Sequence, residues 1–221
     1  MPFRNWAKIL LFLLVYIFAG LALVIIIDGL LTGSELAPFN LALEETMAHL
    51  RTPFLTSLMI IITNIGSPFT LSIIGLFMAM LIKIYKNTFE ALVFIVSIAL
   101  SVISYSLLEN LIHLPHPSGS IITLSAWSFP SGHTAVATAF FFVVAYSFFD
   151  RFKSMTWKVT LVTLSIFGAF IISFSRLYLG AHYALDVLAG IALGLLSVSF
   201  TVLISSIFFE DRRPPRRKKS L

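Results

Sequence analysis

The sequence contains no cysteine and few charged residues. Without cysteine, neither a disulfide framework nor a thiolate metal site is possible, and cysteine usage does not indicate the redox compartment. Charged residues make up only 11% of the 221 residues, whereas 58% are hydrophobic. Soluble domains carry roughly 25% charged residues. This composition, with a mean hydropathy of +0.99, excludes water as the main solvent of the chain.

Six apolar segments are of the right length for membrane helices, since about 20 apolar residues in a helix cross the hydrocarbon core. They are residues 9–27, 68–84, 89–112, 131–149, 157–174 and 184–208. We therefore expect an all-α fold, a polytopic membrane bundle of about six helices that forms one domain over residues 1–221. Polar and apolar residues mix at about 33–52, which predicts an interfacial amphipathic segment.

The distribution of Lys and Arg predicts the orientation, because these residues accumulate in short cytoplasmic loops. With both termini in the cytoplasm, six spans place 13 of the 15 cations there and leave Arg51 and Arg176 on the opposite side. The 13 cations are Arg4, Lys8, Lys83, Lys86, Arg151, Lys153, Lys158, Arg212, Arg213, Arg216, Arg217, Lys218 and Lys219. The net charge of +5 is thus explained by topology, and the basic tail at 210–221 is interpreted as a cytoplasmic anchor near anionic lipid. Nucleic acid is not an expected partner.

The first polar segment at the opposite ends of the spans is Phe129-Pro-Ser-Gly-His-Thr134. Pro and Ser are favourable at helix starts, and Gly permits a ligand to approach the backbone. Free amides at a helix start, together with the helix dipole, bind anions. We therefore expect an anion near Ser131 and Gly132, with His133 beside it. An ordinary helix cap with an interfacial histidine is the alternative interpretation.

The second polar segment extends from Ser175 to Asp186, before and into the last span. His182 and Asp186 are four residues apart, so on a helix they would share one face, and the carboxylate would accept a hydrogen bond from one ring nitrogen. Arg176 carries a guanidinium that suits a phosphate. The alternative is a structural Asp–His pair with an arginine anchor at the interface.

Together, Pro-Ser-Gly-His at 130–133 and Ser-Arg-x5-His-x3-Asp at 175–186 resemble the type 2 phosphatidic acid phosphatase family. The resemblance implies a bundle of about six membrane helices and a substrate phosphate bound by Arg176 and by the amides around Ser131 and Gly132. It also implies that His182 attacks phosphorus to form a phosphohistidine, that Asp186 orients His182, and that His133 protonates the leaving lipid oxygen. No metal or other cofactor is required.

The sequence departs from the family pattern at the end of the third span. The family motif Lys-x6-Arg-Pro aligns with Glu109-x6-His116-Pro117, so Glu109 stands in place of the lysine and His116 in place of the arginine. A phosphate in a poorly hydrated site normally needs several compensating charges. His116 or His113 can supply one when protonated. Otherwise these histidines are loop residues at the interface.

We therefore predict a membrane lipid phosphatase. Its substrate would be a lipid phosphate such as phosphatidic acid, phosphatidylglycerol phosphate or a polyprenyl diphosphate. The alternatives are a phosphotransferase on the same scaffold and a non-catalytic protein that binds lipid phosphate. A short chain with short loops is typical of bacteria, which predicts a multi-pass protein of the cell membrane with its active site on the extracytoplasmic face. The sequence does not indicate the oligomeric state.

Overall fold

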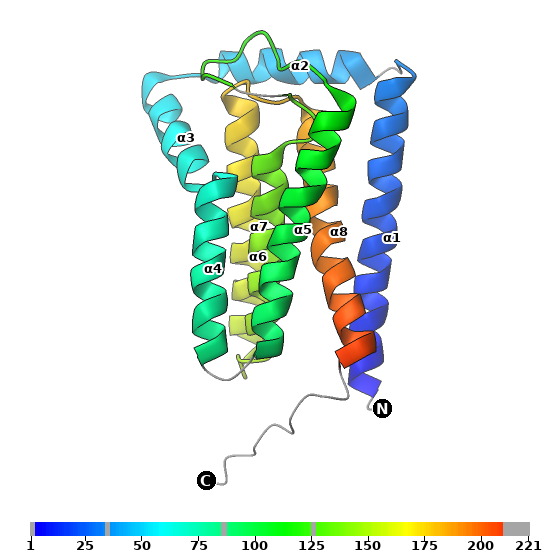
Figure 1. Ribbon diagram of the computed structural model, residues 1–221. Helices are drawn as coiled ribbons and strands as arrows, with labels where there is room; N and C mark the ends of the chain where they lie inside the picture. Colours follow the sequence, from blue (N-terminus) through cyan, green and yellow to red (C-terminus); the bar gives the residue numbers. More distant parts are fainter. Residues whose placement is uncertain (1–2, 34–35, 85–87, 125–126, 210–221) are drawn as a thin grey trace.

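The structure, a computed structural model, describes residues 3–33, 36–84, 88–124 and 127–209. Within these ranges all regular secondary structure is α-helical (Figure 1). The helices are α1 (Phe3–Leu31), α2 (Leu36–His49), α3 (Pro53–Ile65), α4 (Pro68–Ile84), α5 (Thr88–Ile112), α6 (Gly132–Phe149), α7 (Met155–Tyr178) and α8 (Ala184–Phe209). The all-α prediction is confirmed. Lys86 and the basic tail at 210–221 lie outside the described residues.

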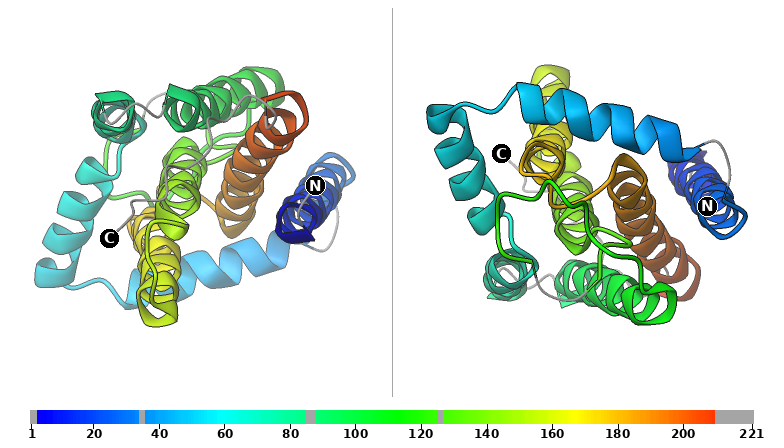
Figure 2. Two further views of the ribbon diagram at one scale, coloured as in Figure 1. Left: turned by 90° about the horizontal axis from the view of Figure 1, so that it is seen from below. Right: turned by 90° about the horizontal axis from the view of Figure 1, so that it is seen from above.

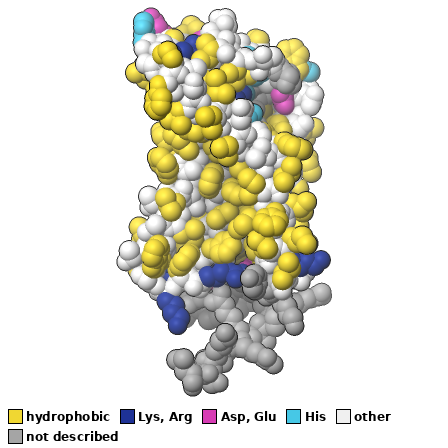
Figure 3. Space-filling model, turned by 90° about the vertical axis from the view of Figure 1, so that its left-hand side faces the viewer, with side chains coloured by type: hydrophobic (Ala, Val, Ile, Leu, Met, Phe, Trp, Pro, Cys, Tyr) yellow, Lys and Arg dark blue, Asp and Glu magenta, His cyan; other side chains and the backbone are white. Residues whose placement is uncertain are grey.

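In the described part of the chain, five helices are individually long and apolar enough to cross a membrane: α1, α5, α6, α7 and α8. The pair α3 and α4 makes a sixth span if the two are taken together. Large apolar side chains such as Leu76 and Phe77 on α4 are exposed on the outside of the bundle, and apolar atoms cover much of the face shown in Figure 3. The prediction of about six membrane helices is therefore confirmed.

The second span differs from its predicted form. The sequence pattern placed it at 68–84 alone, but α4 with its 17 residues is only about 26 Å long, slightly less than the hydrocarbon core. In the structure α3 extends this span toward the end where α2 lies, and the two helices meet at a bend of 49°. Gly66 ends α3, and Pro68, which lacks an N–H, starts α4. The Ser67 hydroxyl accepts the N–H of Thr70 and so caps the new helix.

Helix α6 lies at the centre of the bundle and packs against α4, α5, α7 and α8 (Figure 2). Its contact with α8 is close because α8 presents two glycines one turn apart. A Cβ atom added to Gly190 would lie 2.7 Å from the carbonyl oxygen of Ser131, and one added to Gly194 would lie 2.6 Å from that of Ala135. Small residues at this spacing allow membrane helices to approach closely. The starts of α6 and α8 are thereby held side by side.

An apolar groove of about 300 Å³ runs along the contact between α4 and α5. Its lining includes Gly75 of α4 and Ala99 of α5, and along α5 it reaches Val102 and Ile103. One turn or less further along α5, Tyr105 packs against the start of α6, where a Cβ atom added to Gly132 would lie 2.7 Å from the tyrosine ring. The groove therefore lies within the membrane-spanning part of the bundle and ends just below the first turn of α6.

The two ends of the bundle differ in structure and in charge. At one end α2 lies across the bundle together with the loop that connects α5 to α6 (Figure 1). Helix α2 covers residues 36–49 of the segment at about 33–52 for which an interfacial position is predicted. At the other end Lys8 pairs with Asp150, and Arg151 pairs with Glu90 at 2.8 Å. These ion pairs connect α1 and α5 to the loop between α6 and α7.

We predict that Gly190→Ala destabilises the protein by about 1–3 kcal/mol, the usual cost of an overpacked site. The added methyl group would meet the backbone of α6, which has little room to move. Gly20→Ala on α1 is the matched control, because its methyl group would find its nearest neighbour, Leu196 Cδ2, at 3.8 Å. Thermal unfolding in detergent measures both variants. Equal midpoints would show that the contact between α6 and α8 tolerates a larger residue.

Candidate active site

The segment Phe129–Thr134 folds as the start of α6, as its sequence predicts. Ser131 is the N-cap, and its hydroxyl accepts a hydrogen bond from the Thr134 hydroxyl at 3.1 Å. The Ser131 N–H donates to the main-chain oxygen of Asp186 at 3.0 Å. This amide is therefore already engaged and is not free for a phosphate. The following amides of Gly132 and His133 belong to the first turn of α6, where no intrahelical acceptor exists.

The segment from Ser175 to Asp186 departs from the predicted geometry. Helix α7 ends at Tyr178, α8 begins at Ala184, and His182 lies in the turn between them. His182 and Asp186 therefore do not share a helical face. Instead, the Asp186 carboxylate folds back and accepts the N–H of Tyr183 at 2.9 Å, the arrangement in which an acidic residue in the first turn satisfies the amide of the N-cap residue. A turn that is capped in this way holds His182 just outside the helix.

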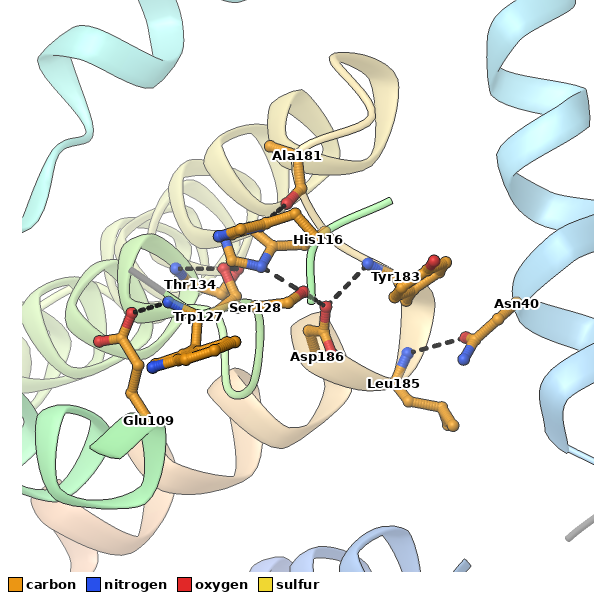
Figure 4. A network of polar contacts seen from close by, with 12 residues as sticks. Asn40, Glu109, His116, Trp127, Ser128, Thr134, Ala181, Tyr183, Leu185 and Asp186 are labelled. Atoms are coloured by element: carbon orange, nitrogen blue, oxygen red, sulfur yellow. Dashed lines mark hydrogen bonds and ion pairs between the residues drawn. The ribbon is translucent and has the colours of Figure 1, made fainter. Parts of the chain in front are cut away.

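Asp186 is the residue on which the polar contacts converge (Figure 4). It is 1% exposed, and its Oδ2 accepts hydrogen bonds from the Ser128 hydroxyl and the Tyr183 amide. The same oxygen lies 3.5 Å from Nδ1 of His182. The distance suits electrostatic attraction, although the two groups do not form a hydrogen bond in this structure. The carboxylate faces Nδ1, and this leaves Nε2 as the ring nitrogen that is available for chemistry.

Burial sets the ionisation of His182, which is 7% exposed. Burial lowers the pKa of His182 below its ordinary value, and the positive charges of Arg176 and His116 act in the same direction. The nearby Asp186 opposes this shift without cancelling it. The imidazole is therefore neutral at physiological pH, the state in which a ring nitrogen carries the lone pair of a nucleophile or base.

Arg176 lies near the end of α7 and is also buried, with 4% of its surface exposed. Its Nη1 donates to the Thr63 hydroxyl of α3 at 2.9 Å, whereas its Nε has no hydrogen-bond partner. A buried guanidinium with an unused donor is costly unless an anion pairs with it. Arg176 and His182 both lie close enough to His133 to act on it electrostatically.

His116 joins this group from the loop between α5 and α6. Its Nδ1 donates to the main-chain oxygen of Ala181 at 2.7 Å, and its ring centre lies 5.2 Å from that of His182. Its Nε2 is buried and has no partner. Because a carbonyl oxygen only accepts, Nδ1 carries a proton. Nε2 is therefore an acceptor when the ring is neutral and a donor when the ring is charged.

Glu109 has a different position. Its carboxylate accepts the main-chain N–H of Trp127 at 3.1 Å, and the Trp127 ring packs edge-on against His113 at 4.9 Å between ring centres. The Ser128 N–H completes this closure by donating to the oxygen of Leu114 at 2.7 Å. In Figure 4 Glu109 points toward the backbone of Trp127. The structure thus brings together His116, Ser131, Gly132, His133, Arg176, His182 and Asp186, while Glu109 holds the loop closed.

Three residues that support the site were not found from the sequence. Ser128 donates to Asp186, Thr63 accepts from Arg176, and the Asn40 side chain of α2 accepts the N–H of Leu185 at 3.3 Å, in the first turn of α8. Ser128 lies directly before the predicted motif, and this proximity was a usable signal. Asn40 and Thr63 are distant in sequence, and no local pattern marks them.

The site lies in the region of the chain that matches known proteins. A family model described as the PAP2 superfamily matches residues 90–210, which include every residue predicted for the site. Phosphatidylglycerophosphatase B from Bacillus subtilis (strain 168) is 30% identical over 163 residues, 70% of this chain and 77% of the relative. The chain belongs to the PAP2 superfamily. This confirms the resemblance found in the motifs and the prediction of a membrane lipid phosphatase.

Solved structures of this superfamily have the same fold. The crystal structure of the first transmembrane PAP2 type phosphatidylglycerolphosphate phosphatase from Bacillus subtilis superposes with a TM-score of 0.75 and 22% identity. The match covers 93% of this chain and 98% of that one. LpxE from Aquifex aeolicus superposes with a TM-score of 0.61 and 24% identity, over 74% of this chain and 94% of that one. At these identities the likeness supports the fold.

Proposed function

We propose that this PAP2 member hydrolyses the phosphate of a membrane lipid through a covalent phosphohistidine on His182. One observation carries the proposal: a buried guanidinium with an unused donor lies beside three imidazoles at one end of a membrane bundle. Of the three imidazoles, that of His182 is kept neutral by burial, and Asp186 faces its Nδ1 and leaves Nε2 for attack on phosphorus. Phosphatidylglycerol phosphate is the first substrate to test, because the similar Bacillus subtilis proteins carry that activity in their names. Phosphatidic acid and polyprenyl diphosphates offer the same phosphate chemistry.

The phosphate is bound by donors from three elements. Arg176 of α7 contributes Nε, the first turn of α6 contributes the amides of Gly132 and His133, and the loop contributes Nε2 of His116 when that ring is protonated. The α6 dipole adds partial positive charge at the same point. Ser131 supports this arrangement indirectly, since its amide is bound to α8 and its hydroxyl caps α6.

The reaction takes place in two steps. First, Nε2 of His182 attacks phosphorus, the bond from phosphorus to the lipid oxygen breaks, and His133 donates a proton to that oxygen. Asp186 stabilises the positive charge that develops on the His182 ring. In the second step, a water molecule attacks phosphorus of the phosphohistidine, and His133 takes up a proton from that water. The bond from nitrogen to phosphorus breaks, inorganic phosphate leaves, and both histidines return to their starting states.

The replacement of two expected cations changes the charge of the site. Arg176 is the permanent cation among the gathered residues, and His116 adds a second charge only when it is protonated. Glu109 adds none, and its carboxylate is engaged with the Trp127 amide. We therefore expect phosphate binding to weaken as the solution becomes alkaline. In a member with lysine and arginine at these positions, those charges would persist through the same pH range.

We further propose a single domain in the bacterial cell membrane, with both termini in the cytoplasm and the site on the extracytoplasmic face. In Figure 1 the start of α1 and the end of α8 lie at the end opposite α2 and the loop between α5 and α6. The described cations Lys83, Arg151, Lys153 and Lys158 belong to the helix ends and loop at the terminal end. Arg51 and Arg176 belong to the other. This asymmetry is the one that the positive-inside rule associates with a cytoplasmic terminal end.

The reaction can be tested by phosphate release from the three lipid phosphates and an aryl phosphate, with purified protein in detergent. His182→Ala should abolish release from every substrate. His133→Ala should lower kcat/KM, which reports the first step, by about 10²–10⁴-fold on the lipid, the usual contribution of a general acid. It should lower kcat/KM on the aryl phosphate much less, because that leaving group needs no proton. The exposed His49 on α2 supplies the control His49→Ala.

Equal losses on both substrate types in His133→Ala would contradict the assignment of His133 as the acid. Wild-type protein that binds lipid phosphate without releasing phosphate would favour the non-catalytic alternative. Phosphate transfer to an added alcohol in preference to water would favour a phosphotransferase.

The role of His116 predicts a difference in pH dependence. Arginine remains charged where an imidazole does not, so the alkaline limb of kcat/KM for His116→Arg should extend to higher pH. Because the wild-type profile also depends on His182 and His133, the comparison between variants carries the test. His113→Arg changes a loop histidine that packs on Trp127 and should leave the profile as it is. Superimposable alkaline limbs for wild type and His116→Arg would show that His116 does not face the phosphate.

The orientation can be measured by cysteine labelling, because the natural chain has no cysteine. Ser118→Cys lies in an exposed loop at the site end, and Lys153→Cys is exposed at the other end. A membrane-impermeant maleimide should label the first variant in intact cells and the second only after lysis. The opposite pattern would reverse the proposed topology.

A further inference from the structure

Arg51 lies in the short link between α2 and α3, at the same end of the bundle as the site. It is half-buried, and its guanidinium makes two hydrogen bonds to main-chain oxygens. Nε donates to Tyr178 at 3.0 Å, and Nη1 donates to Gly119 at 2.9 Å. Its Nη2 is buried without a partner. A planar guanidinium holds two such acceptors in a fixed relation, which a flexible lysine does not do.

The two acceptors belong to the two segments that carry the histidines of the site. Gly119 follows His116 by three residues, and Tyr178 precedes His182 by four. Tyr178 is also the last residue of α7, where a carbonyl oxygen lacks an intrahelical donor and a cation is favourable. Arg51 therefore bridges the loop between α5 and α6 and the turn between α7 and α8.

Neighbouring contacts reinforce this bridge. The Ile121 N–H donates to the oxygen of Leu179 at 3.1 Å, and the Glu44 carboxylate of α2 accepts the N–H of Gly119 at 3.1 Å. Gly180 has φ +67°, and a Cβ atom there would lie 2.6 Å from Nη2 of Arg51 and 2.8 Å from the oxygen of Gly119. The guanidinium of Arg51 is therefore packed tightly between the turn that connects α7 to α8 and the loop that connects α5 to α6.

We propose that Arg51 is a positioning residue for the phosphatase reaction: by joining the loop to the turn, it fixes the distance between His116 and His182. The inference rests on the proposed function of these two histidines. Arg51 acts through the backbone and not as a phosphate ligand. The side-chain charges that act on His182 come from Asp186, Arg176 and His116. His133, Tyr183 and Glu44 of α2 are further titratable groups near it.

The test uses the full-length protein in detergent and measures kcat, KM and pH dependence with phosphatidylglycerol phosphate and with an aryl phosphate. Arg51→Gln should lower kcat at least tenfold on both substrates and change KM less than threefold. The acid limb of the pH profile of kcat for Arg51→Gln should also move to higher pH. Burial lowers the pKa of His182, a loosened turn admits water and raises that pKa again, and His182 must lose its proton before it attacks. Arg51→Lys should give an intermediate kcat.

Hydrogen exchange supplies a readout that does not depend on activity. In Arg51→Gln, peptides that cover residues 117–124 and 177–183 should exchange faster, while peptides from the centre of α6 should be unchanged. If the wild-type protein released no phosphate, the proposed function would be contradicted. The exchange measurement does not need activity, so it would still test whether Arg51 joins the two segments. His49→Gln, a change of an exposed residue on α2, should match wild type in every measurement.

A double-mutant cycle distinguishes this role from general damage. Gly180→Ala disturbs the same junction from its other side, so Arg51→Gln and Gly180→Ala together should cost much less than the product of their separate effects. Effects that simply multiply would overturn the proposal. So would wild-type kcat, acid limb and exchange in Arg51→Gln, or a rise in KM alone, which would identify Arg51 as a phosphate ligand.

Discussion

A carboxylate that is almost fully buried is stable only when other groups donate to it, and the arrangement of this site follows from that requirement at Asp186. Its side chain takes donors from Ser128, just before α6, and from Tyr183, just before α8. Its main-chain oxygen takes the amide of Ser131. These contacts fix the two helix starts relative to one another, and Gly190 allows the helices to approach closely enough for the contacts to form. The position of His182 is a consequence of this junction.

The same requirement explains why the site contains few cationic side chains. Each buried ion costs free energy that only a nearby partner offsets, so Arg176 is held by Thr63 on one side and leaves one donor for an anion on the other. His116 is a milder solution to the same problem, because an imidazole, unlike a guanidinium, has a neutral form. Glu109 would be costly beside a phosphate. In this structure it instead stabilises the loop through Trp127.

The sequence predicted the spans, the two motifs and the family, because all three depend on local patterns of hydropathy, charge and spacing. It placed His182 and Asp186 on one helical face, whereas the carboxylate of Asp186 caps α8 and leaves His182 in the turn. It did not predict that α3 belongs to the second span, since Gly66 and Pro68 interrupt the apolar pattern there. Asn40, Arg51 and Thr63 reach the site from α2, the link and α3. No pattern within those segments specifies such long-range contacts.

The groove between α4 and α5 is an apolar surface to which lipid chains are chemically suited. Its walls are almost entirely hydrocarbon, and it lies within the spanning part of the bundle. Hydrocarbon surfaces distinguish poorly between the chains of different lipids, since burial stabilises each methylene group about equally. A substrate lipid that enters this groove therefore competes there with bulk lipid in two dimensions. The quantity that governs its occupancy is the mole fraction of substrate in the bilayer, and dilution of the vesicles in water leaves that fraction unchanged.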